Sequence, residues 1–521
     1  MVSATYKWEV DWNGNGVFGD ANEDITNDVL RCEWQLGRDY ASMLTGRARG
    51  GKMLITLDNH TNDGKYSSFN TSSPLSGNIL PGRKVRLQAT DASGTVTIWQ
   101  GFLDRINPQV AVGAARTALL EAIGPLAYLG QPWHEIFVPM STNQLTGTLL
   151  GALLDAVSWP AADRDIDAGN TTIRRATFGT RQQKLSVLEA MHRVEEAENG
   201  FLHESTDGKV IFEDRKRRLG GAYLTSQVTV SDSPGAGEIT YSGIAQGDPL
   251  KQIFNTFQSN AQRYAVGAVA VIWTLDETGA DSPGLRVGES RTFVADMLVD
   301  EDSNVGVDTW TTPVATTDYI ANSAADGSGT DLTASIGVAV TKLGTRMLIT
   351  LTNNHASSIA YITKLQGRGT PISRREPVWV YAEDSASQSR YGRRVYSVPS
   401  ELVQNSQEAQ DHVKALLTLY KDPRPTVSLR IFANRDADHL SHVLRRRVSD
   451  RITVKATGSR TQLGINRAFY IEAQRHLVLP GKLHEVTWEC SPIGTRDSIS
   501  GETPWWVLGT GALDDTTALF Y

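Results

Sequence analysis

The chain has 521 residues, of which 40% are hydrophobic, 21% charged and 8% aromatic, and 51 Lys and Arg against 58 Asp and Glu give a net charge of −7. These values are typical of a globular protein of three or four domains and exclude disordered, collagen-like and coiled-coil chains. The acidic balance argues against a chain-wide electrostatic attraction to nucleic acid, and two cysteines exclude a disulfide framework or a multi-cysteine zinc site.

The sequence shows neither an N-terminal signal peptide nor a membrane-spanning helix. The first ten residues lack the apolar stretch of a signal peptide, and the longest apolar run, 265–273, is far short of the roughly 20 residues that a membrane helix needs. We therefore expect a soluble protein made inside the cell, without a membrane span and without sequence-specific binding of nucleic acid.

Short strands dominate the first 130 residues. The stretch 84–89 alternates polar and apolar side chains, which is the period-2 pattern of a half-buried strand. The same pattern recurs along the whole chain, at residues 53–57, 96–99, 117–122, 346–352, 427–432 and 452–456.

A helical period then replaces the strand period. Apolar residues recur at i, i+3 and i+4 in 145–157 and 185–197, and Gly200 stands where a glycine cap would end the second helix. A hairpin follows, in which Asp207-Gly208 supplies the turn. Residues 132–219 are thus predicted to form a small α+β module.

The rest of the chain returns to strands and loops. Residues 220–395 are rich in turn-forming residues, and we expect a β-sandwich-like domain there. One more helix should follow Asn405-Ser406 and stop near Asp422-Pro423, because proline cannot continue the ladder.

A weak internal repeat links the two ends of the chain. Three strand-like stretches occur in the same order with the same alternation near each end, at 82–87, 99–106 and 115–125 and again at 450–455, 469–475 and 483–492. This predicts a mainly β fold with a small α+β module, in which two tube-like β-barrel domains flank inserted domains. Two unrelated three-stranded meanders would show the same pattern, so that alternative stays open.

Two phosphate-binding patterns fail on their context. Residues 14–19 match GxGxxG, but an acidic, non-amphipathic stretch follows instead of a helix. Residues 46–53 resemble a P-loop, but Met53 stands where a hydroxyl must meet magnesium.

The same N-terminal glycines fit a calcium loop better. Asp11, Asn13 and Asn15 alternate before Gly16, and Asp20 is the candidate fourth ligand, with Glu23 or Asp24 as further candidates. Asn22, however, stands at the twelfth loop position in place of the usual Glu. A Gly/Asn-rich β-turn also explains these residues and is the preferred interpretation, so calcium is only a possible cofactor.

No catalytic constellation emerges. His439 and His442 lack a third ligand and are interpreted as a solvated pair, and Cys32 and Cys490 as buried reduced thiols. The carboxylates 195, 196 and 198 are expected to solvate a helix face. The basic runs 215–218 and 445–447 lack interleaved aromatics, so they favour a subunit or tube-lumen contact as much as nucleic acid.

Several motifs resemble minor tail proteins of long-tailed bacteriophages. They are 10–18 with 24–29, Gly37-Arg38 with 48–59, the string 73–86, the hairpin ending at 207–215 and the stretch from Trp506 to Tyr521. They are turn and packing patterns, and they touch both ends and the second domain.

The resemblance implies a tail-tip or baseplate hub that is not an enzyme. In that family two tube-like barrels alternate within a homotrimer, giving a pseudo-sixfold ring that joins the tail tube and distal tail ring to the host-adsorption apparatus. The expected partners are distal tail and tail-tube proteins, the tape-measure protein, and tail fibres or receptor-binding proteins. The expected location is the virion tail tip, assembled in the bacterial cytoplasm.

The implied domains are a first barrel at 1–131, the module at 132–219, the sandwich-like domain at 220–395 and a second barrel with a C-terminal tail at 396–521. Some relatives carry a cell-wall hydrolase after the hub, and we expect none here because the sequence ends at Tyr521. The alternative is a receptor- or carbohydrate-binding tail protein that acts through 220–395.

Overall fold

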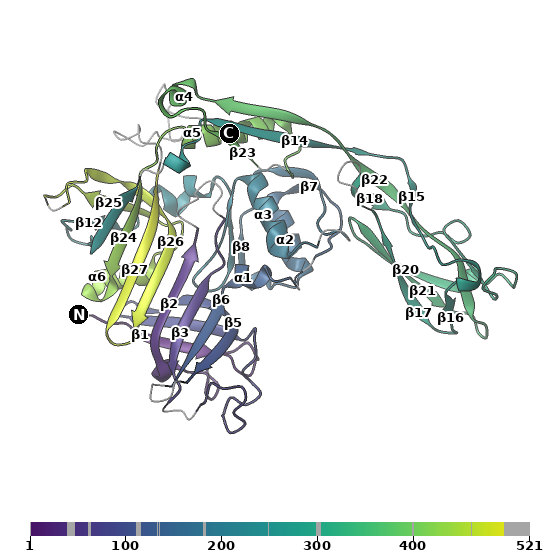
Figure 1. Cartoon of the computed structure of the whole chain (residues 1–521), viewed down its shortest axis with the longest axis horizontal. Coiled ribbons are helices and arrows are strands. Elements are labelled where there is room, and N and C mark those ends of the chain that lie inside the picture. Colours follow the sequence, from purple (N-terminus) through teal and green to yellow (C-terminus); the bar gives the residue numbers. More distant parts are fainter. Residues whose placement is uncertain are drawn as a thin grey trace.

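The computed structural model describes residues 2–38, 47–60, 64–110, 116–132, 134, 136–180, 184–247, 250–298, 304–398, 401–459 and 461–493. The motif from Trp506 to Tyr521 lies outside these residues. The fold is mainly β with a small helical module, as predicted from the sequence (Figure 1).

A 12-stranded sheet forms the body of the molecule, and its strands fall into two blocks (Figure 1). The N-terminal block has the spatial order β1–β4–β5–β6–β3–β2, with bounds Thr5–Val10, Lys84–Asp91, Gly94–Gln109, Thr117–Ile123, Lys52–Asp58 and Val29–Gly37. The C-terminal block has the order β12–β25–β26–β27–β24–β13, with bounds Thr229–Ser231, Arg451–Ala456, Ile465–Leu479, Leu483–Pro492, Thr426–Phe432 and Gly243–Gly247.

The two blocks share one topology. In both, the strands that come first to sixth along the chain take the spatial order first–fourth–fifth–sixth–third–second. Even a register shift recurs, between Leu103 and Arg105 on β5 and between Ile471 and Ala473 on β26. One ladder differs, because β1 runs antiparallel to β4 whereas β12 runs parallel to β25. The predicted three-strand repeat is β4–β6 and β25–β27.

Each block curls so that its first and second strands approach. Val10 N donates to Glu23 O and Ile25 N to Trp8 O, and the chain then enters β2. In the C-terminal block, Ser231 N donates to Ile239 O just before β13. Within the described residues these isolated bonds, rather than a continuous ladder, bring the edges of each block together.

The α+β module packs against both blocks. Its elements are α1 (Pro125–Leu129), β7 (Ser141–Leu145), α2 (Thr146–Ala156), β8 (Arg164–Ile166), β9 (Thr172–Ala176), α3 (Val187–Glu198), β10 (Phe201–Glu204) and β11 (Val210–Glu213). The two predicted helices are α2 and α3, and Gly208 at φ +80° turns the predicted hairpin. Asn199, at φ 55°, takes the left-handed capping position that had been assigned to Gly200.

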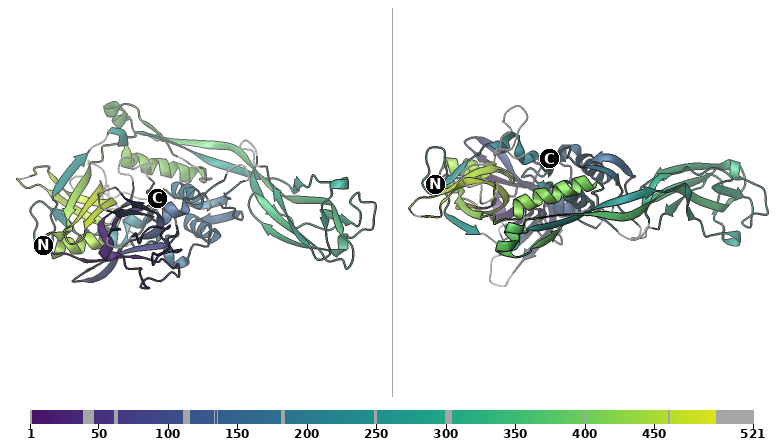
Figure 2. Two further views of the ribbon diagram at one scale, coloured as in Figure 1. Left: turned by 60° about the horizontal axis from the view of Figure 1, so that its bottom comes forward. Right: turned by 90° about the horizontal axis from the view of Figure 1, so that it is seen from above.

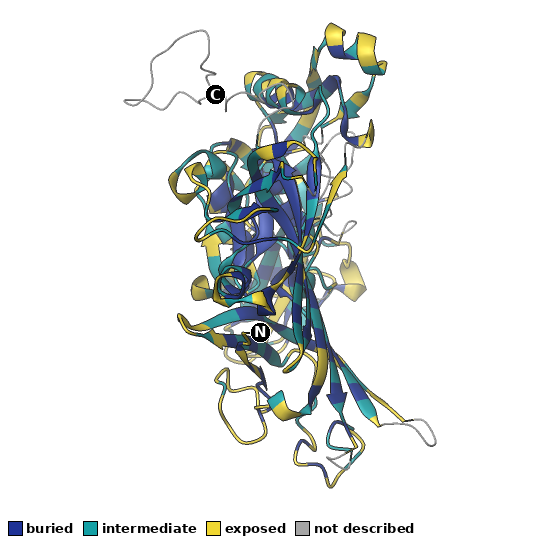
Figure 3. Cartoon of the chain, turned by 90° about the vertical axis from the view of Figure 1, so that its left-hand side faces the viewer, coloured by how far each residue is buried: buried dark blue, intermediate teal, exposed yellow. Residues whose placement is uncertain are grey.

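A long two-stranded ribbon projects from the body and ends in a separate β unit (Figures 1 and 2). This far β unit is here called the arm. The ribbon is β14 (Thr256–Val266) with β22 (Ala360–Glu383). The far unit holds β15 (Ala270–Thr274), β16 (Gly284–Leu285), β17 (Ser290–Asp296), β18 (Asn304–Trp310), β19 (Tyr319–Asn322), β20 (Ile336–Lys342) and β21 (Arg346–Asn353). Its core, which includes Trp310 and Ile349, is distinct from the core of the body. Figure 3 shows buried residues gathered along the central strands of the body.

The remaining elements return the chain from the ribbon to the C-terminal block. They are α4 (Ser385–Tyr391), β23 (Val395–Ser397), α5 (Ser406–Tyr420) and α6 (Ala437–Arg445). The side chain of Asn405 caps α5, which ends at Tyr420, close to the predicted limits.

The C-terminal block is assembled from two distant stretches of sequence. β12 and β13 come from residues 229–247, which were predicted to lie in the sandwich-like domain, and the other four strands come from 426–492. The ribbon and arm are therefore inserted between the second and third strands of the C-terminal block. The division into four domains stays a prediction.

Candidate functional site

The two blocks are joined by one antiparallel ladder, here called the joint. Residues 32–37 of β2 pair with residues 473–478 of β26. β2 is the second strand of its block and β26 the fifth strand of the other, so the joint brings together two different edges of one repeated fold. Such a contact is heterologous.

Aromatic and histidine rings fill the buried side of the joint. Trp34 and His476 lie opposite each other with their rings stacked, at 4.5 Å between centroids and 4° between planes. His476 Nδ1 lies 3.0 Å from His484 Nε2, and His484 Nδ1 lies 2.7 Å from the hydroxyl of Tyr6. Burial lowers the pKa of His484 to about 3. Burial, followed by the charges of His484 and Arg447, also lowers the pKa of His476. Both rings are therefore neutral at pH 7.

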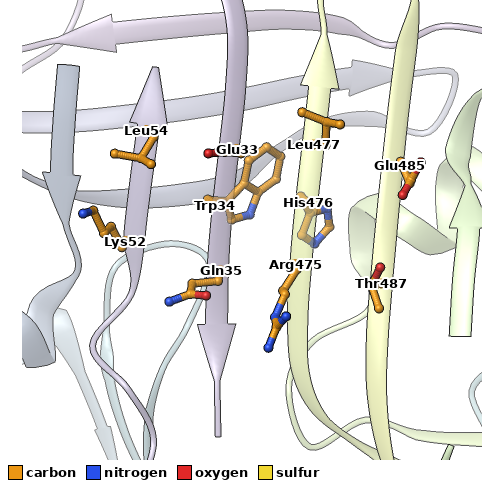
Figure 4. A pocket seen from close by; sticks show the side chains of 10 residues that line it. All are labelled: Glu33, Trp34, Gln35, Lys52, Leu54, Arg475, His476, Leu477, Glu485 and Thr487. Atoms are coloured by element: carbon orange, nitrogen blue, oxygen red, sulfur yellow. The ribbon is translucent and has the colours of Figure 1, made fainter. Parts of the chain in front are cut away.

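The joint also carries a hollow of about 360 Å³, and Trp34 and His476 are among the residues that line it. Figure 4 shows its polar lining coming from four adjacent strands, with Glu33 and Gln35 on β2, Lys52 on β3, Arg475 on β26, and Glu485 and Thr487 on β27. Arg430 donates to both oxygens of Glu485, at 2.7 and 2.6 Å. The outer face of the joint therefore carries charges of both signs.

A buried ionic cluster ties the module to both blocks. Arg218, which follows β11, donates to Glu472 of β26 at 2.7 Å and lies 3.5 Å from Glu213. The guanidinium of Arg38, at the end of β2, lies 3.9 Å from Glu472 and 3.9 Å from the ring centroid of Phe201 in the module. Burial alone would raise the pKa of Glu472, but the charges of Arg218 and Arg38 and hydrogen bonds lower it to about 2. The cluster holds its carboxylates ionised.

A second buried carboxylate fixes the module to the N-terminal block. Glu204 of β10 accepts hydrogen bonds from Gly51 N at 2.8 Å and from Leu126 N at 2.6 Å. Burial raises the pKa of Glu204 to about 7, and the backbone donors act against that rise. Glu204 and the ionic cluster thus connect the module to the N-terminal block and to the C-terminal block.

Each block leaves one edge without a partner strand. β4 and the residues before it pair with β5 only as far as Leu103, so this edge of residues 104–109 faces no other strand in the described part of the chain. β13 pairs with β24 along one edge, and no described strand pairs with its other edge. These edges correspond to those that β26 and β2 use in the joint.

The structure brings the four predicted calcium ligands together in one loop. Asp11 accepts from Gly14 N at 2.7 Å and from Gly16 N at 2.8 Å, and Gly16 has φ +82°. The side-chain amides of Asn13 and Asn15 both donate to Asp20 Oδ2, at 2.7 and 2.8 Å. The loop thus has the sharp turn of a calcium loop, but its amide nitrogens, rather than oxygens, point at Asp20. Calcium binding stays a prediction.

Other sequence-based interpretations need correction. His439 is buried and bonded to Thr240 N and Asp436, so it is not solvated. Glu195 and Glu198 are buried as well, and both accept backbone hydrogen bonds.

The two basic runs are also tied down within the chain. Arg217 and Arg218 pair with carboxylates of the module and the C-terminal block, and Arg445 pairs with Asp91 at 2.5 Å. Their charges therefore hold elements of one chain together. Cys32 and Cys490 are buried free thiols, as predicted.

The most important residues of this site were not predicted from the sequence. His476 and His484 occupy the inward phase of alternating strands, and Glu472 interrupts an apolar stretch. A polar residue at an inward position was the available signal. Within the described ranges, no cluster of three His, Cys, Asp or Glu is arranged for a metal ion, and no helix is long and apolar enough to cross a membrane.

No protein-family model and no curated protein sequence matches the chain. Among solved structures, the chain is similar to the tail protein from Neisseria meningitidis MC58, with 10% identity over 96% of this chain and 98% of that chain, at a TM-score of 0.49. It is also similar to the 43 kDa tail protein of prophage MuSo2 from Shewanella oneidensis, with 10% identity over 93% and 97% of the chains and a TM-score of 0.45.

A third neighbour is the prophage tail protein gp18 from Listeria monocytogenes EGD-e, with 9% identity over 93% and 94% of the chains and a TM-score of 0.39. All three neighbours are described as tail proteins, the class that the sequence resembles. Because all three TM-scores lie below 0.5, the function proposed for this chain rests on its own residues.

Proposed function

We propose that this chain is a structural hub of a bacteriophage tail tip or baseplate. Three copies form a pseudo-sixfold ring that joins the tail tube and distal tail ring to the host-adsorption apparatus. Its neighbours are distal tail and tail-tube proteins, the end of the tape-measure protein, and fibres or receptor-binding proteins. The ring is assembled in the host cytoplasm and resides in the virion.

The observation that carries this proposal is the heterologous joint between two blocks of one topology. A heterologous contact that repeats with a constant rotation generates a closed ring when that rotation divides a full turn, and an open filament otherwise. A rotation of about 60° per block closes after six blocks, which is three chains. The motifs that resemble minor tail proteins support placing such a ring at the tip of a bacteriophage tail.

The oligomeric state tests the proposal. Light scattering on the purified full-length chain under assembly conditions should give three chain masses, and a map of the particle tip should contain six similar β-blocks in one ring. A stable monomer at micromolar concentration would contradict it.

The proposed role is not enzymatic, because the sequence contains no catalytic constellation. Purified protein should leave host cell walls intact in a clearing assay. Clearing that persists in protein freed of contaminating hydrolases would overturn this part of the proposal.

A second candidate function is receptor or carbohydrate binding through the 220–395 region. The observation in its favour is the arm, which projects from the body (Figure 2), together with Trp379 and Tyr381, which are 63% and 67% exposed on one face of β22. Exposed aromatic side chains next to each other often mark a binding surface.

A glycan array and a host-cell binding assay with the full-length chain test this second candidate. The Trp379→Ala variant should lose binding, and the matched Phe69→Ala variant, at a 94% exposed aromatic residue of the N-terminal block, should keep it. Blank results for the unmodified chain would sink the candidate.

A further inference from the structure

The joint inside the chain can be compared with the unpaired edges of the two blocks. The repeated topology allows the residues of one block to be placed on the other, starting from the shared register shift. Leu103 corresponds to Ile471 and Arg105 to Ala473, so Val110 corresponds to Val478. On the second strand of each block, Ile244 of β13 corresponds to Cys32 of β2. Ile244 pairs with Leu429 of β24 and Cys32 pairs with Ile55 of β3, and Leu429 and Ile55 occupy equivalent positions in the two blocks.

We infer that the free edge of β13 pairs antiparallel with the free edge of β5 of a second copy, in the register of the internal joint. This inference rests on the proposed ring and names the strands that close it. The pair Cys32–Val478 becomes Ile244–Val110, and the pair Glu33–Leu477 becomes Ala245–Gln109.

Exposure supports the choice of edge. Val110 is 69% exposed in the single chain, whereas Val478, its counterpart in the joint, is fully buried at 0%. Ile244 is half-buried, whereas its counterpart Cys32 is fully buried. An apolar residue left exposed at the place where its structural equivalent is buried is what a missing neighbouring block would leave.

Edge protection points the same way. Natural sheets blunt free edges with charges, prolines or covering segments, because unpaired backbone groups attract other strands. Residues 107–110, which would pair with residues 247–244, carry only Pro108 of that kind, and neither stretch is charged; the charged Asp104 and Arg105 of the same edge lie outside these pairs. Because Pro108 lacks an N–H, the new ladder would depend on the hydrogen bonds on either side of it.

Engineered disulfides test the register. Directly opposed residues in an antiparallel pair have Cα atoms about 4.5–5.5 Å apart, within reach of a disulfide. A chain with Ala245→Cys and Gln109→Cys should form covalent trimers on mild oxidation, and each single variant should not. The pair Ala245→Cys with Arg105→Cys is the control, since it is out of register by four residues, or about 13 Å.

A disruption experiment complements the crosslink. Val110→Asp would bury a carboxylate in the contact, so trimers should dissociate at protein concentrations at least tenfold higher than for the unmodified chain. Val287→Asp is the matched control, because Val287 is 49% exposed and lies between β16 and β17, in the far β unit rather than in either block.

The outcomes separate this inference from the proposed function. Trimers by light scattering that crosslink only through the in-register pair support both. Trimers that do not crosslink, or that tolerate Val110→Asp, overturn this joint and leave the hub function standing. Monomers that never crosslink overturn both, and crosslinked ladders longer than three chains keep the joint but contradict ring closure.

Discussion

Two histidines at the joint are held neutral by their surroundings. His484 has a pKa lowered from 6.5 to about 3, and that of His476 is lowered as well, whereas the unfolded chain protonates both near 6.5. Above that pH neither state binds the proton, so stability does not change. As the pH falls from 6.5 towards 3, only the unfolded state binds the proton of His484, and the free energy of unfolding decreases by about 1.4 kcal/mol per pH unit. His476, whose pKa is also lowered, adds a loss of the same sign below pH 6.5.

This sign gives a measurable prediction. His476→Phe preserves the ring over Trp34 and removes one of the two protons, so the loss of stability between pH 6.5 and 4.5 should be shallower by about one proton. Urea unfolding at several pH values measures the slope. The exposed His60→Phe is the control, and an unchanged slope in His476→Phe would contradict the assignment.

Two neighbouring arginines, Arg218 and Arg217, allow the contribution of the buried ionic cluster to stability to be measured against that of a more exposed ion pair. Arg218→Met leaves Glu472 and Glu213, whose side chains are 2% and 3% exposed, without their main cation. Breaking a buried pair on one side costs about 3–5 kcal/mol. Arg217→Met removes the cation that pairs with the half-exposed Asp165 and with Asp167. This change should lower the free energy of unfolding by about 1 kcal/mol or less. Chemical denaturation compares the two variants, and equal losses would contradict the central place of the cluster.

The N-terminal loop carries the calcium prediction. We propose that Asp11, Asn13, Asn15 and Asp20 bind calcium once the two amides turn their oxygens inward. Glu23 is 1% exposed, and its Oε1 has no hydrogen-bond partner among the described residues, which leaves an oxygen available nearby. Titration calorimetry with calcium should release or absorb heat that disappears in Asp20→Asn. Absence of heat in the unmodified chain would establish the simple turn.

At the scale of elements, a glycine ends β2 where the blocks meet. Gly37 has φ +98°, and a Cβ there would lie 2.2 Å from the carbonyl oxygen of Glu472. Gly37→Ala should therefore destabilise the protein in two ways: the positive φ costs about 1–3 kcal/mol of backbone strain, and the new Cβ clashes with the backbone of β26 at the joint. Gly94→Ala is the control, because Gly94 has φ +114° with no atom within 4 Å and suffers the strain alone. Equal shifts in melting temperature would show that the backbones at the joint can separate at no cost.

Local patterns predicted most elements but not their arrangement. The alternation in 84–89 and the helical period in 185–197 each specify one element, because both depend only on which side of that element faces the core. The repeat even placed β4–β6 and β25–β27 correctly. The assignment of β12 and β13 to the C-terminal block was out of reach, because the pairing of residues 229–247 with residues 426–456 depends on contacts across the whole arm insertion.

The functional residues were hidden for a related reason. A charged residue such as Arg218 looks the same in a solvated basic run as in a buried pair, because its partner Glu472 lies 254 positions away. His476 and His484 carried a usable signal, since both fall on the inward phase of their strands, but polar residues at inward positions have many causes.

On the scale of the whole molecule, the arm separates the two candidate functions. Its core is distinct from that of the body, and Val266 lies opposite Ile372 where the ribbon meets the far unit. Replacing residues 267–371 by Asn-Gly closes the ribbon with a two-residue turn that suits antiparallel strands. The deletion also removes bonds between the arm and the module, including the 2.7 Å ion pair of Arg175 with Asp308 and the hydrogen bond from Gly344 N to Val138 O.

The shortened chain should fold and still form trimers, because the joint, the ionic cluster and both free edges lie in the body. Light scattering measures this, and a monomer would mean that the arm, rather than the blocks, holds the ring together. Particles built with the shortened chain then decide the role of the far β unit: a hub that only joins other tail parts predicts normal assembly and adsorption, whereas a receptor site in the far unit predicts assembled particles that no longer attach to the host. The shortened chain keeps Trp379 and Tyr381, so a receptor site at these two residues is tested by Trp379→Ala instead. Failure to assemble despite normal trimers would instead make the arm a contact for another tail protein.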